Sequence, residues 1–186
     1  EMIIQMNKRD KRIFDAYRIN INTGEMKMVG ENPGNITGWM TDHDGKIRIA
    51  QATDGVNISL LYRDNENQKF NTVKTLNFKQ SLSPMLFTFD NEKVYALSNL
   101  NRDKKAVILY DIKNDEEEEV IFEHPEVDVM NLSYSKKRKV LTAIRYYTDK
   151  NHYHFLDENR KQLQEELEKK LPGYEVRVAS MRKDET

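Results

Sequence analysis

The chain of 186 residues carries 30 basic and 31 acidic side chains, so its formal net charge is -1 at pH 7. A nearly neutral chain has no electrostatic reason to bind nucleic acid or an anionic membrane, and we expect neither partner. Hydrophobic residues make up 38% of the chain and charged residues 33%. This balance favours small sheets that pack narrow faces on their neighbours over one thick apolar core.

Cysteine is absent, which excludes disulfides and thiol catalysis but does not choose between cytoplasm and periplasm. No apolar run approaches the roughly 18 residues that span a bilayer, and residues 1–4 lack the basic start and long apolar core of a signal peptide. We therefore expect a soluble chain, and the sequence does not decide between the cytoplasm and the periplasm.

The first unit predicted from the sequence covers residues 1–33. Strands are predicted at 2–6, 13–21 and 25–29, with a turn at Asn22-Thr23-Gly24, and Asn32-Pro33-Gly34 closes the unit. Compared with the later units it lacks one strand at its start. We interpret it as a partial blade.

A complete unit is predicted over residues 34–80. Its strands are expected at 36–41, 46–50, 57–63 and 73–78, and Asp44-Gly45 is a strong hairpin signal between the first two. A second complete unit is predicted over 81–125, with strands at 85–89, 93–97, 106–110 and 120–122. The acidic run 115–119 is interpreted as a charged hairpin loop.

The unit over residues 126–173 begins with predicted strands at 131–135, 140–147 and 153–156 and then changes its period. Leu163, Leu167 and Leu171 are spaced by four, which predicts a surface helix over 157–171 that rests its leucine stripe on the last blade. Asp157 can cap the helix, and Pro172-Gly173 ends it. Residues 174–181 alternate again, so 174–186 is predicted to start a further blade.

An internal repeat of roughly 45 residues relates these units. The second strands align at Lys46-Ile47, Lys93-Val94 and Lys139-Val140, and an aspartate precedes each third strand at Asp10, Asp54, Asp103 and Asp149. The third strands then place Tyr17, Tyr62, Tyr110 and Leu156 in equivalent positions. Four strands per repeat at this period predict an all-β fold, a partial β-propeller of four-stranded antiparallel blades with one inserted surface helix.

Propellers need about four to eight blades to close, so two complete and two incomplete units would leave the ring open. We therefore expect residues 1–186 to be a single incomplete propeller segment of a longer protein. The alternative is a complete small β-domain of unusual design.

The sequence predicts no catalytic, cofactor-binding or metal-binding residue. None of its seven glycines lies in a Gly-x-Ser-x-Gly turn, and Ser83, Ser98, Ser133 and Ser135 are interpreted as sheet or turn hydroxyls. Four other patterns are interpreted as structural. Asp42-His43-Asp44 is interpreted as a solvated turn, and His152 and His154 are interpreted as packing or surface residues rather than metal ligands. The run 115–119 lacks the features of a calcium-binding loop, and Met26 and Met28 are interpreted as core residues.

The run Ile13-Phe-Asp-Ala-Tyr-Arg-Ile-Asn-Ile-Asn-Thr-Gly-Glu25, followed by Glu31-Asn-Pro-Gly34 and Trp39-Met-Thr-Asp-His-Asp-Gly-Lys-Ile-Arg48, resembles the N-terminal propeller of prolyl oligopeptidase-family serine peptidases. Bacterial dipeptidyl and acylaminoacyl peptidases are the nearest look-alikes, although the Tyr-Arg and Thr-Gly-Glu elements also occur in TolB-like propellers. The resemblance implies a C-terminal α/β-hydrolase domain with a Ser-Asp-His triad outside this chain. It carries over no catalytic residue.

The resemblance implies a non-catalytic region that gates or positions peptide substrates for that hydrolase domain, so the expected partners are the hydrolase domain and peptides. The alternative is a TolB-like or WD-type propeller that binds another protein and is attached to no enzyme. Sequence after Thr186 distinguishes them, because a Gly-x-Ser-x-Gly there supports the peptidase.

Overall fold

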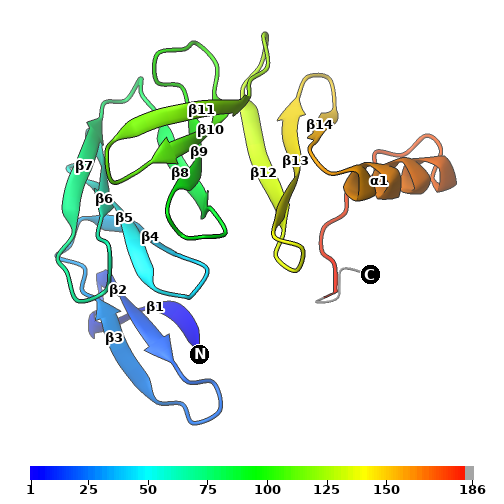
Figure 1. The fold of residues 1–186 in the computed structure, drawn as a ribbon. Coiled ribbons are helices and arrows are strands. Elements are labelled where there is room, and N and C mark those ends of the chain that lie inside the picture. Colours follow the sequence, from blue (N-terminus) through cyan, green and yellow to red (C-terminus); the bar gives the residue numbers. More distant parts are fainter. Residues whose placement is uncertain (183–186) are drawn as a thin grey trace. The chain divides into compact units, whose positions relative to one another are not determined.

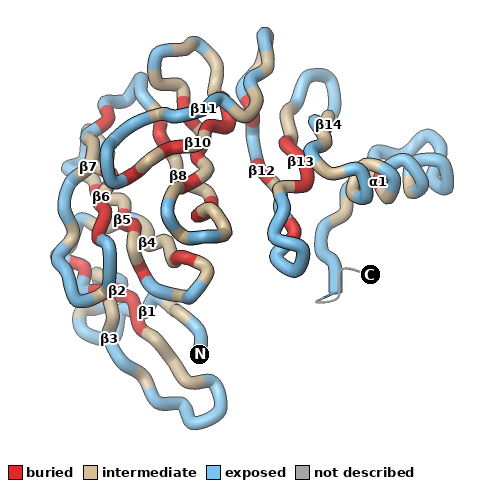
Figure 2. The backbone as a smooth tube through the Cα atoms, viewed as in Figure 1, coloured by how far each residue is buried: buried red, intermediate tan, exposed pale blue. Residues whose placement is uncertain are grey.

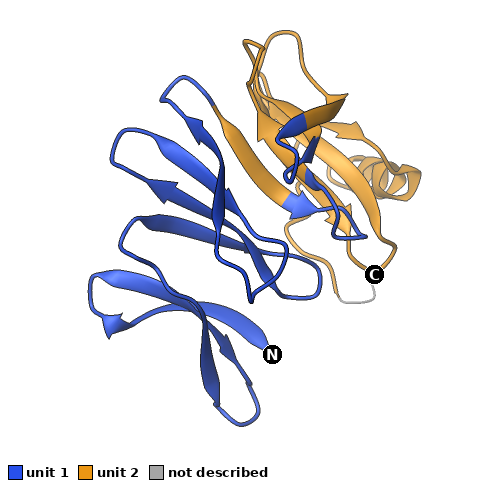
Figure 3. Ribbon diagram, turned by 60° about the vertical axis from the view of Figure 1, so that its left-hand side comes forward, with its two compact units in different colours: residues 1–80, 86–94, 110–116 blue, residues 81–85, 95–109, 117–186 orange. Residues whose placement is uncertain are grey.

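The computed structural model describes residues 1–182, and in this part of the chain it contains fourteen strands in four antiparallel sheets and one helix, α1 (Glu158–Lys170) (Figure 1). The predicted all-β class with one helix is therefore confirmed. Two compact units divide the chain, one of residues 1–80, 86–94 and 110–116 and the other of residues 81–85, 95–109 and 117–186 (Figure 3). No helix in the described part is long and apolar enough to cross a membrane.

The first sheet has the order β1-β2-β3 and is formed by β1 (Met2–Asp10), β2 (Ile13–Ile19) and β3 (Met26–Gly30). Asp15 on β2 is fully buried, and it accepts hydrogen bonds at 2.9 Å from Nε and Nη2 of Arg9 and at 2.8 Å from the backbone N–H of Asn32. A buried carboxylate is stable only when it is paired in this way. Met28 is 41% exposed, so its prediction as a core residue is wrong; it lies on the edge strand of this sheet, which has no neighbour beyond it among the described sheets.

The second sheet has the order β4-β5-β6-β7 and is formed by β4 (Ile36–Thr41), β5 (Ile47–Thr53), β6 (Ile58–Tyr62) and β7 (Asn71–Leu76). Arg63 connects it to the first sheet, because its buried guanidinium donates to the carbonyl oxygen of Ile47 at 2.8 Å and to that of Val29 at 3.1 Å. Trp39 on β4 also meets the first sheet. A methyl group on Gly30 would lie 3.1 Å from two atoms of its ring, so only glycine fits without displacing it.

The third sheet has the order β11-β10-β9-β8 and is formed by β8 (Leu82–Phe87), β9 (Val94–Ser98), β10 (Ala106–Asp111) and β11 (Glu116–Phe122). The acidic run was predicted as a loop, and this is wrong for Glu116 to Glu119, which lie in β11. They are tolerated there because β11 is the edge strand of its sheet, where charged side chains reach water and discourage edge-to-edge pairing.

The fourth sheet has the order β12-β13-β14 and is formed by β12 (Val129–Ser135), β13 (Val140–Tyr147) and β14 (Asn151–Phe155). Helix α1 follows it, and Asp157 caps the helix as predicted by accepting a hydrogen bond from the backbone N–H of Arg160 at 2.9 Å. The helix contacts β14.

The predicted leucine stripe is only partly right. The deeply buried position of α1 is Gln164, which is 2% exposed, whereas Leu163 and Leu167 are half-buried and Leu171 is 47% exposed. Gln164 is drawn inward because its amide donates to the carbonyl oxygen of Val176 at 2.7 Å and to Glu168 at 2.8 Å. This bond ties the helix to the segment that follows it.

No strand forms over residues 174–182, where alternation predicted one. A strand needs a hydrogen-bonded neighbour, and no described segment pairs with this one. Its role as the start of a further blade remains a prediction.

The internal repeat corresponds to equivalent structural positions. The aligned second strands β5, β9 and β13 begin at Ile47, Val94 and Val140, and the third-strand tyrosines Tyr17, Tyr62 and Tyr110 are all buried. Leu156 departs from the pattern because it follows β14 and is 39% exposed. Figure 2 shows buried residues concentrated on the strands and exposed residues on the loops and most of α1.

Candidate functional site

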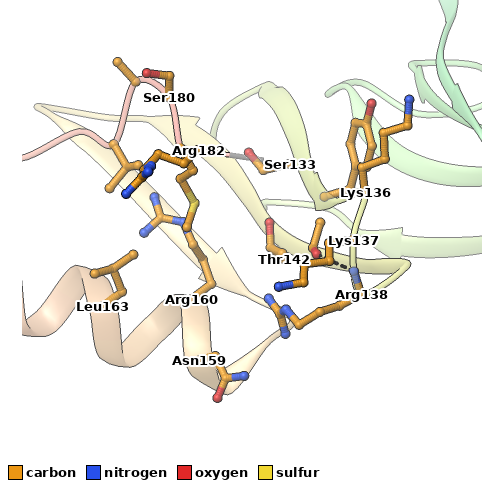
Figure 4. Close-up of a pocket in the computed structure, with 15 residues that line it drawn as sticks. Ser133, Lys136, Lys137, Arg138, Thr142, Asn159, Arg160, Leu163, Ser180 and Arg182 are labelled. Atoms are coloured by element: carbon orange, nitrogen blue, oxygen red, sulfur yellow. Dashed lines mark hydrogen bonds between the residues drawn. The ribbon is translucent and has the colours of Figure 1, made fainter. Parts of the chain in front are cut away.

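A pocket of about 710 Å³ lies in the unit that contains α1, between the β12–β13 hairpin, the first turns of α1 and residues 178–182 (Figure 4). None of the described residues that line it is Asp or Glu. Its basic lining residues are Lys136, Lys137, Arg138, Arg160 and Arg182. A concave region with one sign of charge raises the local potential well above that of the chain as a whole, whose net charge is only -1.

Hydroxyl and apolar groups complete the lining. Ser133, Ser135, Thr142 and Ser180 bring hydroxyls, and Leu163, Val178 and Met181 bring apolar surface. A pocket that combines charged groups, hydroxyl donors and apolar walls is of the kind that binds organic ligands, and its volume falls in their usual range.

Arg160 is the cation of greatest interest. Its guanidinium donates to the amide oxygen of Gln164 at 3.3 Å, and it forms no ion pair with any carboxylate in the described part of the chain. Burial lowers the pKa of Arg160, because the charged guanidinium has lost part of its hydration. A partly desolvated arginine without an anion is favourably placed to receive one.

Arg138 is held by the protein itself. It donates to both carboxylate oxygens of Asp157 at 2.7 and 2.8 Å, and its backbone N–H donates to Ser135 Oγ at 2.9 Å. The pKa of Asp157 is lowered mainly by its hydrogen bonds from Arg138. These contacts join the hairpin to the start of α1 and so fix two walls of the pocket.

The serines considered as nucleophiles lie on strands. Ser83 is on β8, Ser98 on β9, and Ser133 and Ser135 on β12. Ser98 Oγ accepts a hydrogen bond from the backbone N–H of Leu100 at 3.1 Å, and Ser135 Oγ accepts one from the backbone N–H of Arg138 at 2.9 Å. These bonds give both hydroxyls structural roles.

The interpretation of Asp42-His43-Asp44 as a solvated turn is wrong for Asp42, which is buried, and for His43, which is half-buried, whereas Asp44 is exposed. Asp42 is 7% exposed, and its carboxylate accepts from the backbone N–H groups of Asp44 and Lys46 at 3.0 and 2.9 Å. His43 Nε2 donates to the carbonyl oxygen of Phe87 at 2.9 Å, and its ring stacks on Phe89. His43 is partly covered because it contacts the hairpin of the next repeat, where its backbone N–H also donates to Asn91 at 2.9 Å.

His152 and His154 on β14 pack against aromatic rings. His154 stacks on Phe122 with ring centroids 4.3 Å apart, and His152 stacks on Tyr146 at 5.4 Å. The His124 ring also contacts Tyr146, with ring centroids 4.6 Å apart. Among residues 1–182 no group of three His, Cys, Asp or Glu is placed to hold a metal ion.

Comparisons with known proteins indicate a distant relationship. No protein family model matches the chain. The chain is similar to "Dipeptidyl aminopeptidase BIII" from Pseudoxanthomonas mexicana, with 23% identity over 113 residues, which is 60% of this chain and 16% of that protein. The chain is thus distantly related to part of a peptidase, and it spans a small fraction of that relative's length.

Proposed function

We propose that this chain is a non-catalytic β-propeller region of a peptidase of the prolyl oligopeptidase type, in which it limits the access of peptides to a hydrolase domain and positions them for cleavage. The observation that carries the peptidase assignment is the similarity over 113 residues to a dipeptidyl aminopeptidase. Consecutive four-stranded meanders with a repeat in register support the propeller. The units 34–80 and 81–125 are its complete blades in this proposal.

The division of labour has a physical basis. A serine triad needs its nucleophile on a strained strand-to-helix turn, with donor amides fixed beside it. Meanders joined by short loops do not provide such a turn. Loops at the rim of a propeller can instead restrict substrate size and orient the peptide, which changes access to the reaction and not the reaction itself.

The test compares the 186-residue chain with the product of its complete reading frame. Both are assayed with chromogenic aminoacyl and dipeptidyl substrates, with and without a serine-directed phosphonate. We expect the 186-residue chain to be inactive and the complete product to cleave short peptides in a phosphonate-sensitive way. Activity in the 186-residue chain alone would contradict the non-catalytic role.

The second candidate function is a protein-binding propeller attached to no enzyme. The basic pocket beside α1 favours it, because the pocket offers charge and shape for a ligand, while the described residues that line it include no Asp, Glu or His that could activate a hydroxyl. A complete product that is inert and insensitive to the phosphonate would support this candidate.

A further inference from the structure

We propose that the basic pocket between the β12–β13 hairpin, α1 and residues 178–182 binds an acidic peptide segment through its carboxylates. The inference goes beyond the proposed function, because it concerns this chain alone and holds whether or not the complete protein is a peptidase.

The charges of the pocket specify an anion. Lys136 on the hairpin, Arg160 on α1 and Arg182 after it come from three separate segments and line the same pocket (Figure 4). None of the three forms an ion pair with a described carboxylate, in contrast to Arg138, which is paired with Asp157. Cations on separate walls of one pocket make its potential positive, and this potential favours an anion in the pocket.

Arg160 indicates the geometry of recognition. Its side chain is partly buried and has one neutral partner, the amide of Gln164. A guanidinium presents a planar fork of donors that matches a carboxylate with two parallel hydrogen bonds. In a partly desolvated site such a bond is stronger than on an open surface.

The size and walls of the pocket favour a peptide over a small inorganic anion. A volume of about 710 Å³ exceeds what a single phosphate requires. Leu163, Val178 and Met181 offer apolar contacts for the methylene groups of glutamate side chains. Residues 178–182 are in no sheet of the described chain, so an extended peptide can lie along their backbone.

The test is a binding titration in which fluorescence anisotropy measures the bound fraction of a labelled peptide. The probe is tetraglutamate carrying fluorescein on a flexible linker, and tetraglutamine with the same label is the uncharged control. We expect the 186-residue chain to bind tetraglutamate at least about tenfold more tightly than tetraglutamine, with an affinity that falls as salt is added.

Variants locate the binding site. Arg160→Gln should weaken tetraglutamate binding about tenfold, and Lys136→Gln, at an exposed position, about threefold. Arg177→Gln is the matched control, because Arg177 is an exposed cation of the segment after α1 that does not line the pocket. Its affinity should stay within about twofold of the unmodified chain. Thermal melting shows whether each variant is folded. If Arg160→Gln does not fold, the affinity of Lys136→Gln decides the test.

Three results would overturn the proposal: unchanged affinity in both Arg160→Gln and Lys136→Gln, an equal loss in Arg177→Gln, or equal binding of tetraglutamine. Competition with glutarate and inorganic phosphate tests the kind of anion. Displacement of tetraglutamate by glutarate at the lower concentration supports carboxylate recognition. Displacement by phosphate at the lower concentration would overturn it.

Discussion

Arg138 and Asp157 are joined by two parallel hydrogen bonds of 2.7 and 2.8 Å that connect the β12–β13 hairpin to the start of α1. The same carboxylate accepts the backbone N–H of Arg160 at 2.9 Å, so one side chain both pairs with the hairpin and caps the helix. This double role explains how a sheet and a helix that share few contacts keep a pocket between them.

Replacing Asp157 should therefore show two separable effects. Asp157→Ala removes the cap and the ion pair, and we expect it to lower the free energy of unfolding by about 1–2 kcal/mol. Asp157→Asn retains a capping oxygen but loses the charge and one of the two oxygens that accept from Arg138, so its cost should be smaller than that of Asp157→Ala by the contribution of the cap. Chemical denaturation monitored by circular dichroism measures the free energy of unfolding of both variants. Equal losses in the two variants would show that the cap contributes nothing.

The contact between Gly30 and Trp39 gives a second prediction. A methyl group at position 30 would lie 3.1 Å from the Trp39 ring and 3.3 Å from Cβ of Ala16, so the ring must shift. Gly30→Ala should lower the free energy of unfolding by about 1–3 kcal/mol through overpacking. Trp39 is the only tryptophan, so its fluorescence should change as well.

Gly38→Ala is the matched control for Gly30→Ala. Apart from its two chain neighbours, a methyl group at position 38 meets no atom within 4 Å, so stability should not fall. A loss of stability as large as that of Gly30→Ala would mean that the contact with Trp39 is not the cause.

Much of the fold was predictable because strands alternate with a period of two. The strands β4 and β13 begin and end where alternation placed them, and the aligned residues Ile47, Val94 and Val140 each begin a strand. The period of two was less informative for the edge strand β11, where four consecutive side chains are charged. The glutamates of β11 have no apolar face to alternate, so the acidic run resembled a loop.

The pocket was not predictable because its cations are far apart along the chain. Lys136 and Arg160 line the same pocket, whose walls are held by the Arg138–Asp157 pair and by the bond from Gln164 to Val176, and no local pattern encodes either contact. One signal was present: the hairpin 136–138 is Lys-Lys-Arg where the preceding repeat has Asp90-Asn91-Glu92. This reversal of charge gives the turn a positive surface that the equivalent turn of the preceding repeat lacks.

Acid should weaken the first sheet through Asp15. The hydrogen bonds from Arg9 are the main cause that lowers the pKa of Asp15 below its usual value of about 3.9. The stabilisation by this carboxylate is therefore present above about pH 4 and is lost as the pH falls through the lower folded value. Asp15→Asn should cost about 2 kcal/mol near pH 7, and its difference from the unmodified chain should shrink below pH 4.

Denaturation midpoints at several pH values test the Asp15 prediction, with Asp10→Asn as the control. Asp10 pairs with Arg12, whose side chain is 84% exposed, so its replacement should leave the midpoint near pH 7 nearly unchanged. A difference between Asp15→Asn and the unmodified chain that stays constant through pH 3 would contradict the role of the charge.

The last prediction concerns Gln164, whose buried amide holds the carbonyl oxygen of Val176 at 2.7 Å. Gln164→Leu keeps a side chain of similar size but leaves that carbonyl without its donor, so the segment after α1 should open more often. Trypsin should then cut after Arg177 about tenfold faster, while cleavage elsewhere keeps its rate. Gln162→Leu is the matched control on the same helix, because Gln162 is exposed and its side chain donates to Glu158 at 3.3 Å. If both variants are cut at the unmodified rate, the Gln164–Val176 bond does not hold this wall of the pocket, and if both are cut faster, the effect belongs to the helix as a whole.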